Sequence, residues 1–318
     1  MTGPFAVRTR GLRRTYGGRA AVCDLDLTVP AGETFGFLGP NGAGKSTTIA
    51  MLCTLLRPTA GTAEVAGADV VRAPWLVRRR IGVVFQEPTV DRELTAEENL
   101  RLHAELYGMS RRDARVRSRQ LLALFGLDRP RVPVGAFSGG MRRRLELARS
   151  LMHHPGVLFL DEPTVGLDPQ SRAVVWDHLY GLRREQPITL FLTTHQLEEA
   201  EHCDRIVVLN HGRVVAQGTP QQLKAEVGAD VVHLRTADDA GVAAALTESG
   251  LTAGHGPDGV RVVTADGAGL VPRLCAGLTT PVHSVTVTRP SLDDVFLHHT
   301  GRTIRDAGGA ELSPTQGR

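Results

Sequence analysis

Four short runs of apolar residues lie within the first 210 positions. Each is followed by glycine-rich or polar residues of types that are common in binding and catalytic sites. Runs that are apolar on both faces are typical of buried parallel strands. Open α/β sheets bind ligands at the carboxyl ends of such strands, so the residues that follow the runs are expected at one edge. The runs are Thr34–Leu38 before a glycine-rich segment, Ile81–Phe85 before Gln86, Val157–Leu160 before Asp161-Glu162, and Ile188–Leu192 before Thr193-Thr194-His195.

Helical patterns fill the intervals between these strands. We expect one helix over Lys45–Leu56 and another over Leu94–Tyr107, where Thr95-Ala96-Glu97-Glu98 forms an N-terminal capping pattern. The pattern of the segment 88–136 indicates mainly helical structure. It predicts a helical lobe inserted into the α/β core and able to rotate relative to it.

The pattern changes after Gly218, where a small α+β arrangement begins. The alternation predicts a βαββαβ-like accessory domain over residues 221–300, after a first domain over residues 1–220. Residues 301–318 are rich in Gly, Pro, Ser and Thr and are expected to form a mobile tail. The expected accessory elements are strands Asp230–Arg235, Gly259–Thr264 and Val282–Thr288 and helices Ala237–Ser249 and Ala268–Leu278.

Composition narrows the class of protein. A chain of 318 residues with 42% hydrophobic content can bury a sizeable core. No stretch approaches the roughly 18 apolar residues that cross a bilayer, and Met1–Gly11 lacks the apolar centre of a signal peptide. The four cysteines are far apart, with no zinc or disulfide spacing. We therefore expect a protein of the reducing cytoplasm, and its net charge of +3 gives no reason to expect nucleic acid.

Basic residues are almost all arginine. Only Lys45 and Lys224 are lysine among 37 basic residues, a skew that we attribute to coding bias. The runs Arg78–Arg80, Arg111–Arg119 and Arg142–Arg144 are therefore expected to be solvated helix faces. Lys45 stands out against this background and indicates a slot for a compact ammonium.

The glycine-rich segment after the first strand has the complete spacing of a nucleotide phosphate loop, Gly39-x-x-x-x-Gly44-Lys45-Ser46. Glycines let the backbone turn its N–H groups toward phosphate. Lys45 is expected to reach the β- and γ-phosphates, the Ser46 hydroxyl to coordinate Mg²⁺, and Thr47 to add a phosphate contact. The predicted phosphate-binding positions of the loop are Gly39, Asn41, Gly42, Gly44, Lys45, Ser46 and Thr47.

Two carboxylates end the third strand. Asp161 is predicted to hold Mg²⁺, directly or through water, and Glu162 to act as the general base that polarises the attacking water.

Twenty residues before Asp161, Phe137-Ser138-Gly139-Gly140-Met141 opens a helix expected over Arg142–Met152. Its backbone N–H groups offer a second phosphate-binding surface.

These motifs, in this order, resemble the nucleotide-binding subunit of ABC transporters over residues 5–220. The resemblance implies a P-loop NTPase core, with Phe137–Met141 as signature segment, Gln86 as Q-loop, Gly166–Pro169 as D-loop and His195 as switch histidine. In that family two subunits sandwich two ATP molecules, which implies a homodimer.

The resemblance also implies individual roles. Gln86 contacts Mg²⁺ and the attacking water, His195 contacts the γ-phosphate, and Tyr16 stacks on adenine. The remaining nucleotide contacts, made toward ATP held by the partner subunit, are Ser138, Gly139, Gly140 and Asp168. ATP is expected over GTP on this basis alone, since stacking does not discriminate between bases.

The signature departs from Leu-Ser-Gly-Gly-Gln at Phe137 and Met141, and Met141 lacks the amide of glutamine. Together with Pro290–Leu297, these residues resemble the daunorubicin-resistance type of exporter ATPase, although Pro290–Leu297 also fits an amphipathic helix that packs locally. The implied function is efflux of an amphipathic drug, natural product or lipid. It requires separate permease subunits docked near Gln86 and Pro88–Glu97, which place the chain at the cytoplasmic face of the membrane.

Three alternatives remain at this point. An ABC importer ATPase is the nearest, and the two unusual signature residues favour export against it. A translation factor would carry two cassettes, whereas one phosphate loop occurs here. A chromosome-maintenance ATPase would place a long coiled coil between phosphate loop and signature, which here are only about 94 residues apart (138 − 44).

Overall fold

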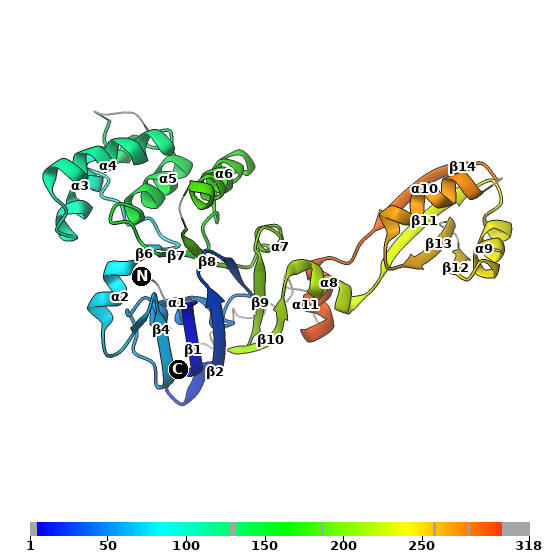
Figure 1. The fold of residues 1–318 in the computed structure, drawn as a ribbon, viewed down its shortest axis with the longest axis horizontal. Coiled ribbons are helices and arrows are strands. Elements are labelled where there is room, and N and C mark those ends of the chain that lie inside the picture. The colour runs from blue at the N-terminus through cyan, green and yellow to red at the C-terminus, as the bar shows by residue number, and fades with distance from the viewer. Residues whose placement is uncertain (1–4, 128–131, 186, 257–258, 279, 301–318) are drawn as a thin grey trace, which may run out of the picture. The chain divides into compact units, whose positions relative to one another are not determined.

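The computed structural model describes residues 5–127, 132–185, 187–256, 259–278 and 280–300. Its contacts divide these residues into two compact units, 5–219 and 220–300 (Figure 1). We call them the ATPase unit and the C-terminal unit and describe each by itself. The tail predicted for residues 301–318 lies outside the described residues.

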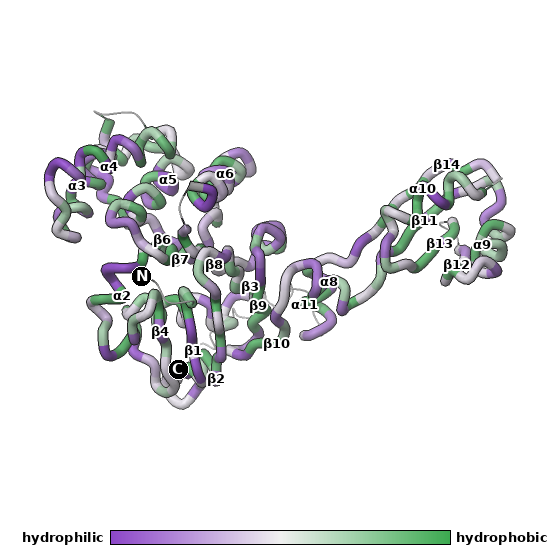
Figure 2. Tube along the Cα trace, viewed as in Figure 1, coloured by the Kyte–Doolittle hydropathy of each residue, from purple (hydrophilic) through white to green (hydrophobic). Residues whose placement is uncertain are grey.

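A six-stranded sheet forms the centre of the ATPase unit, in the order β10-β9-β3-β8-β7-β6. Neighbours from β9 to β6 pair in parallel, and β10 pairs antiparallel with β9. Every residue of β3, β7 and β8 is buried, as their mainly apolar sequences predict. Figure 2 colours the chain by hydropathy, with hydrophobic residues in green. The strands are β3 Thr34–Leu38, β6 Ile81–Val84, β7 Val157–Asp161, β8 Thr189–Thr194, β9 Arg205–Asn210 and β10 Arg213–Gly218. The four predicted strands are thus neighbours in one sheet.

A second, four-stranded sheet was not predicted. Its order is β2-β1-β4-β5, with antiparallel pairing throughout. Buried and exposed residues alternate along parts of β2, so its apolar signal is diluted compared with that of the central strands. The strands are β1 Phe5–Tyr16, β2 Arg19–Pro30, β4 Ala60–Val65 and β5 Ala68–Asp69.

Helices of the ATPase unit link these strands. The helix after the phosphate loop ends at Leu52 rather than at the predicted Leu56. The helix after the signature begins at Gly139 rather than at Arg142, because the Ser138 hydroxyl caps it by accepting a hydrogen bond from the Met141 N–H (3.2 Å). The helices outside the lobe are α1 Lys45–Leu52, α2 Pro74–Arg80, α5 Gly139–Ser150, α6 Pro169–Glu185 and α7 Leu197–Ala200.

A helical segment lies between β6 and α5 (Figure 1). It contains α3 (Ala96–Leu106), α4 (Arg111–Leu124) and the short helix η1 (Val134–Ala136). Thr95 and Glu98 form the predicted capping box at the start of α3. We refer to this segment as the helical lobe.

The C-terminal unit has the order βαββαβ between two outer helices. Its antiparallel sheet runs β12-β13-β11-β14, and its core is formed by residues such as Val232, Leu234 and Val260. Strand β12 was not predicted from the sequence, because it is rich in glycine and mostly exposed. The elements are α8 Pro220–Val227, β11 Asp230–Thr236, α9 Asp239–Glu248, β12 Thr252–Gly256, β13 Gly259–Thr264, α10 Gly267–Gly277, β14 Val282–Thr288 and α11 Leu292–Thr300.

The Leu292–Phe296 motif forms most of α11. Its apolar residues Leu292, Val295 and Phe296 are buried, and α11 packs against α8. The carboxylate of Asp294 accepts hydrogen bonds from the backbone and hydroxyl of Ser291, which caps the helix. Local helix packing, one of the two readings of this motif, is therefore what these residues do in this structure.

Candidate active site

The phosphate loop bends between β3 and α1 and leaves an open pocket of about 600 Å³. Gly44 has φ 102°, and a Cβ at this position would lie 2.5 Å from the Ala21 carbonyl oxygen. Only glycine fits there. The loop residues that line the pocket are Asn41, Gly42, Gly44, Lys45, Ser46 and Thr47.

Gln86, Glu162 and His195 line the same pocket. They come from the ends of β6, β7 and β8, which the parallel pairing brings to one edge. The predicted convergence of strand ends is therefore seen in the structure, at the phosphate loop itself.

Lys45 lies against the loop that it follows. Its ammonium donates hydrogen bonds to the carbonyl oxygens of Gly39 (2.7 Å) and Pro40 (3.1 Å), and it lies 3.5 Å from Glu162 Oε1. Burial lowers the pKa of the Lys45 ammonium, and the attraction of Glu162 partly offsets this effect. A phosphate group entering the pocket can replace these contacts of the ammonium.

Glu162 accepts a hydrogen bond from His195 Nδ1 at 3.0 Å. Because a carboxylate only accepts, this nitrogen carries the hydrogen. Burial alone would raise the pKa of the Glu162 carboxyl, but the His195 hydrogen bond and the Lys45 charge together hold the pKa below its ordinary value. These two contacts thus keep Glu162 ionised near neutral pH.

The backbone of Glu162 is in the left-handed region, with φ 50°. Its N–H donates to the Thr193 carbonyl and hydroxyl oxygens at 3.2 and 3.1 Å, and these bonds fix the turn. This conformation is uncommon for a residue with a side chain and occurs often at functional sites. It directs the carboxylate to His195 and Lys45.

Asp161 and Ser46 form a second polar pair. The Ser46 hydroxyl donates to Asp161 Oδ1 at 3.2 Å, and the Thr193 hydroxyl donates to the same oxygen. A hydroxyl beside a carboxylate is a suitable oxygen set for Mg²⁺ when phosphate oxygens complete the coordination. The described residues contain no cluster of three or more His, Cys, Asp or Glu side chains that could hold a metal by themselves.

Six of the predicted nucleotide contacts do not line this pocket. Gly39 is one of them, and its carbonyl oxygen accepts the hydrogen bond from Lys45. Tyr16 is about half exposed, and the Arg14 guanidinium lies 4.5 Å from its ring centroid. Ser138, Gly139 and Gly140 begin α5, and a Cβ on Gly140 would meet Ser171 Oγ at 2.6 Å. Asp168 is exposed, and hydrogen bonds from the side chain of Ser171 and from its N–H (2.9 Å) lower the pKa of the Asp168 carboxyl.

The prediction that arginine runs are solvated is wrong at several positions. Arg143 and Arg117 are buried, at 6% and 9% exposure, and each guanidinium donates to backbone carbonyls. Arg144 donates to the Phe125 carbonyl oxygen at 2.8 Å. Helix ends and strand ends leave carbonyls that need donors, and these arginines supply them. Because arginine is so frequent in this chain, the sequence did not distinguish these buried arginines from the solvated ones.

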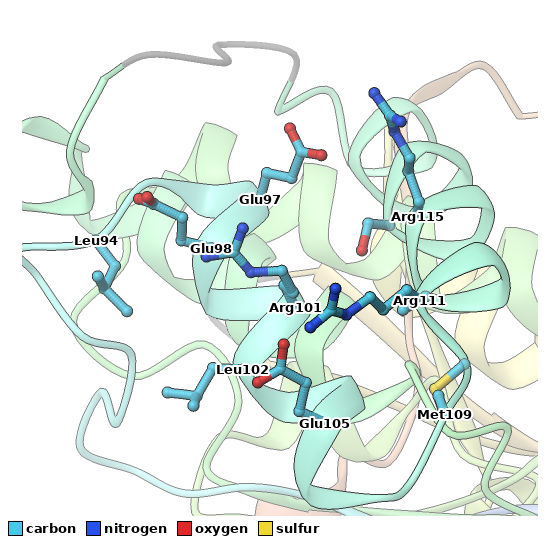
Figure 3. Close-up of a pocket in the computed structure, with 11 residues that line it drawn as sticks. Leu94, Glu97, Glu98, Arg101, Leu102, Glu105, Met109, Arg111 and Arg115 are labelled. Carbon is cyan, nitrogen blue, oxygen red and sulfur yellow. The ribbon is translucent and has the colours of Figure 1, made fainter.

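A separate hollow of about 650 Å³ lies in the helical lobe between α3 and α4 (Figure 3). Carboxylates and guanidinium groups both line it, and Leu94, Leu102 and Met109 add apolar surface. It shares no lining residue with the phosphate-loop pocket. We assign it no chemistry. Its charged lining residues are Glu97, Glu98, Arg101, Glu105, Arg111 and Arg115.

Comparison with known proteins shows the family to which the chain with this phosphate-loop pocket belongs. The ABC transporter family profile matches residues 22–165. The chain is 45% identical over 312 residues to the daunorubicin resistance ATP-binding protein DrrA3 of Streptomyces coeruleorubidus, covering 95% of this chain and 98% of that protein. The chain belongs to the ABC transporter ATP-binding proteins.

A second relative is named for export. The Nod factor export ATP-binding protein I of Ralstonia nicotianae is 40% identical, over 93% of this chain and 94% of that protein. These relatives confirm the predicted function class, an exporter ATPase of the daunorubicin-resistance type, and they favour it over the import, RNA and DNA alternatives.

Solved ABC structures confirm the fold. CbiO1 of Clostridium perfringens, part of the transporter complex cbiONQ, has a TM-score of 0.65 at 28% identity, covering 70% of this chain and 92% of that one. The ATP-binding cassette MJ0796, as a post-hydrolysis dimer with ADP and Pi, has a TM-score of 0.62 at 27% identity, covering 67% and 98%. The chain is an ABC ATPase that binds ATP.

Proposed function

We propose that this chain hydrolyses ATP to power export of an amphipathic drug, natural product or lipid through separate permease subunits. The observation that carries the proposal is the pocket in which Lys45, Glu162 and His195 meet at the phosphate loop. The names of the relatives, which refer to daunorubicin resistance and Nod factor export, support the cargo class.

The phosphates of ATP would lie along the loop, with Lys45 at the β- and γ-phosphates and Asn41, Gly42, Gly44 and Thr47 around them. Ser46 and Asp161 would hold Mg²⁺ together with Gln86 at the pocket edge. When bound, Mg²⁺ supplies charge neutralisation for the phosphates. Tyr16 has the exposure that stacking on a base requires.

Glu162 is the general base in this proposal. Its ionised carboxylate accepts a proton from the attacking water, while the Nδ1 hydrogen of His195 holds the carboxylate in place. The other ring nitrogen of His195 is then available to the γ-phosphate. Lys45, which lies 3.5 Å from Glu162, moves its charge to phosphate when ATP enters.

A second copy of the chain completes the site in this proposal. The start of α5, with Ser138, Gly139 and Gly140, presents a helix N-terminus that favours an anion. Asp168 lies one residue before α6 and beside Ser171, which faces Gly140. The dimeric state of the cassette MJ0796 supports pairing of two such surfaces across ATP.

We place the permease contact where the core meets the helical lobe. A pocket of about 320 Å³ is lined there by Leu55, Phe85 and Tyr107, among others. Leu55, Trp75 and Leu106 are 61, 62 and 77% exposed, which is unusual for such large apolar side chains. Cytoplasmic helices of the permease docked at this surface would hold the chain at the cytoplasmic face of the membrane. Among the described residues, no helix is long and apolar enough to span a bilayer.

The purified parent chain and its Glu162→Gln variant test the proposal. The variant should bind ATP, lose about 10²- to 10⁴-fold in turnover, and form an ATP-dependent dimer in size-exclusion chromatography. Adding Ser138→Arg should abolish that dimer, because the larger cation would occupy the place of the partner's γ-phosphate. Turnover at the parent rate in Glu162→Gln would contradict the base assignment, and an undiminished dimer in the double variant would contradict the shared site.

A further inference from the structure

Helix α5 carries charged side chains at intervals of three residues on the side that faces the catalytic strands. Arg143 and Glu146 are almost completely buried, at 6% and 1% exposure, and Arg149 follows one turn later. Arg143 Nη1 and Glu146 Oε2 are 3.2 Å apart. Burial of an ion pair is costly, so these groups are expected to have other partners.

Arg143 donates to the backbone at the ends of two catalytic strands. Its guanidinium reaches the carbonyl oxygens of Pro163 at 2.6 Å, Glu162 at 3.0 Å and Asp161 at 3.3 Å. It also donates to the carbonyl oxygen of Phe85, the residue directly before Gln86. One side chain therefore joins α5 to the general base and to the Q-loop.

Glu146 holds the other end of the Q-loop. Its Oε1 accepts hydrogen bonds from the backbone N–H of Thr89 at 2.6 Å and from the Thr89 hydroxyl at 3.2 Å. Arg149 donates to the Thr89 carbonyl oxygen at 2.8 Å and to its hydroxyl. Gln86 thus lies in a short segment whose two ends, Phe85 and Thr89, are both bound to α5.

We propose that Arg143 and Glu146 are positioning residues that transmit the location of α5 to Gln86 and Glu162. The first turn of the same helix carries Ser138 and the signature glycines, so a phosphate bound there would set the position of the catalytic side chains. The inference rests on the proposed function, because it uses the roles given there to Gln86, Glu162 and Ser138. Rigid helices and contiguous polar networks are able to carry such coupling.

Arg143→Lys tests this inference. Lysine keeps the positive charge beside Glu146, but a single ammonium cannot reproduce the planar fork that reaches both strand ends. We expect kcat to fall at least tenfold while KM for ATP changes less than twofold, because the phosphate loop is untouched. A purely structural role would instead lower the thermal midpoint and leave the kcat of the folded fraction unchanged.

Arg117→Lys is the matched control. Arg117 is also buried, and its guanidinium donates to the Leu151 carbonyl oxygen just beyond the end of α5. No described contact of Arg117 involves Phe85, Gln86 or residues 161–163. Its kcat should remain within twofold of the parent value. An equal fall in kcat for Arg117→Lys and Arg143→Lys would overturn the inference.

Glu146→Gln provides a second variant in case Arg143→Lys does not fold. Glutamine is close in shape and can still accept from Thr89, but it removes the charge that fixes Arg143. We expect kcat to fall at least threefold with KM for ATP within twofold of the parent value. Parent kcat in this variant would overturn the inference. The proposed function fails separately, if the parent chain does not hydrolyse ATP or if Glu162→Gln hydrolyses it at the parent rate.

Discussion

The two units both place helices against a sheet, yet they bury different kinds of side chain. In the ATPase unit Lys45, Asp161 and Glu162 are each less than a tenth exposed. In the described part of the C-terminal unit the buried polar set contains Thr236 and no charged residue. Burial of charge costs free energy unless partners compensate for it. The contrast shows that the ATPase unit accepts that cost, at the phosphate loop and the strand ends beside it among other places, and that the described part of the C-terminal unit does not.

Lys45→Met should have the largest effect and would test whether the buried charge is functional. Loss of the ammonium that faces the phosphates should lower kcat/KM for ATP by about 10²- to 10³-fold, or about 2.7–4 kcal/mol. Steady-state ATPase assays measure this value. The control is Lys224→Met, the same exchange at the other lysine of the chain, in α8 of the C-terminal unit. Similar losses in both variants would contradict the contrast between the units.

Leu234→Ala probes the apolar core of the C-terminal unit. Leu234 is fully buried on β11, and its truncation should cost about 2–5 kcal/mol of the unfolding free energy of this unit. Scanning calorimetry should show a lower midpoint for one transition, with ATPase activity retained below it. Leu297→Ala, at a leucine that is 44% exposed, should change stability by less than about 0.5 kcal/mol. A fall in kcat for Leu234→Ala at 25 °C would show that the units are coupled.

His195→Ala tests, through the pH dependence of kcat/KM, whether the contacts of the buried Glu162 serve activity. In the proposed function, hydrolysis requires the ionised Glu162 carboxylate. ATPase activity is therefore expected above the pKa of Glu162 and should be lost as pH falls through that pKa. Removal of the His195 hydrogen bond should raise this pKa and shift the acid limb of kcat/KM to higher pH. We also expect about a tenfold lower kcat/KM near neutral pH, or about 1.4 kcal/mol. An acid limb at the parent position would contradict the role of His195. His255→Ala, on the exposed strand β12, is the control.

The smallest effect is expected at the helix caps, where the units do not differ. Thr95 caps α3 and Ser291 caps α11 by the same pattern of reciprocal hydrogen bonds. Replacement of either by alanine should cost about 1 kcal/mol, measured by denaturant unfolding. A loss above about 3 kcal/mol at only one of the two caps would show that this cap supports more than its helix.

The sequence predicted the elements whose signal is local. The phosphate loop, the apolar strands and the Thr95 capping box each depend on residues within a few positions of one another. The sheet β2-β1-β4-β5 was missed because many residues of its strands are exposed, which dilutes the apolar signal, and because β1 pairs with β4 from a distant part of the sequence. The glycine-rich β12 was missed for lack of apolar side chains.

The candidate site shows the same division. Spacing was sufficient to select Lys45, Glu162 and His195, which the structure brings to one pocket, and Asp161, which accepts a hydrogen bond from Ser46. It could not find Arg143, whose partners are main-chain carbonyls 18 to 58 positions away. Contacts with the backbone leave no complementary residue in the sequence, so only the three-dimensional structure reveals them.

The left-handed backbone of Glu162 (φ 50°) lowers folding stability at a residue that the proposed function needs for turnover. A residue with a Cβ pays about 1–2 kcal/mol at such a φ, whereas glycine does not. Glycine would also remove a buried carboxylate, but it would leave the buried Lys45 ammonium without the ion pair that offsets its burial. The unfolding free energy of Glu162→Gly therefore reports the balance between relieved backbone strain and the unpaired Lys45 charge, while a screen for ATP-dependent export should reject this variant. The position offers a measure of the folding stability that is lost to the base proposed at Glu162.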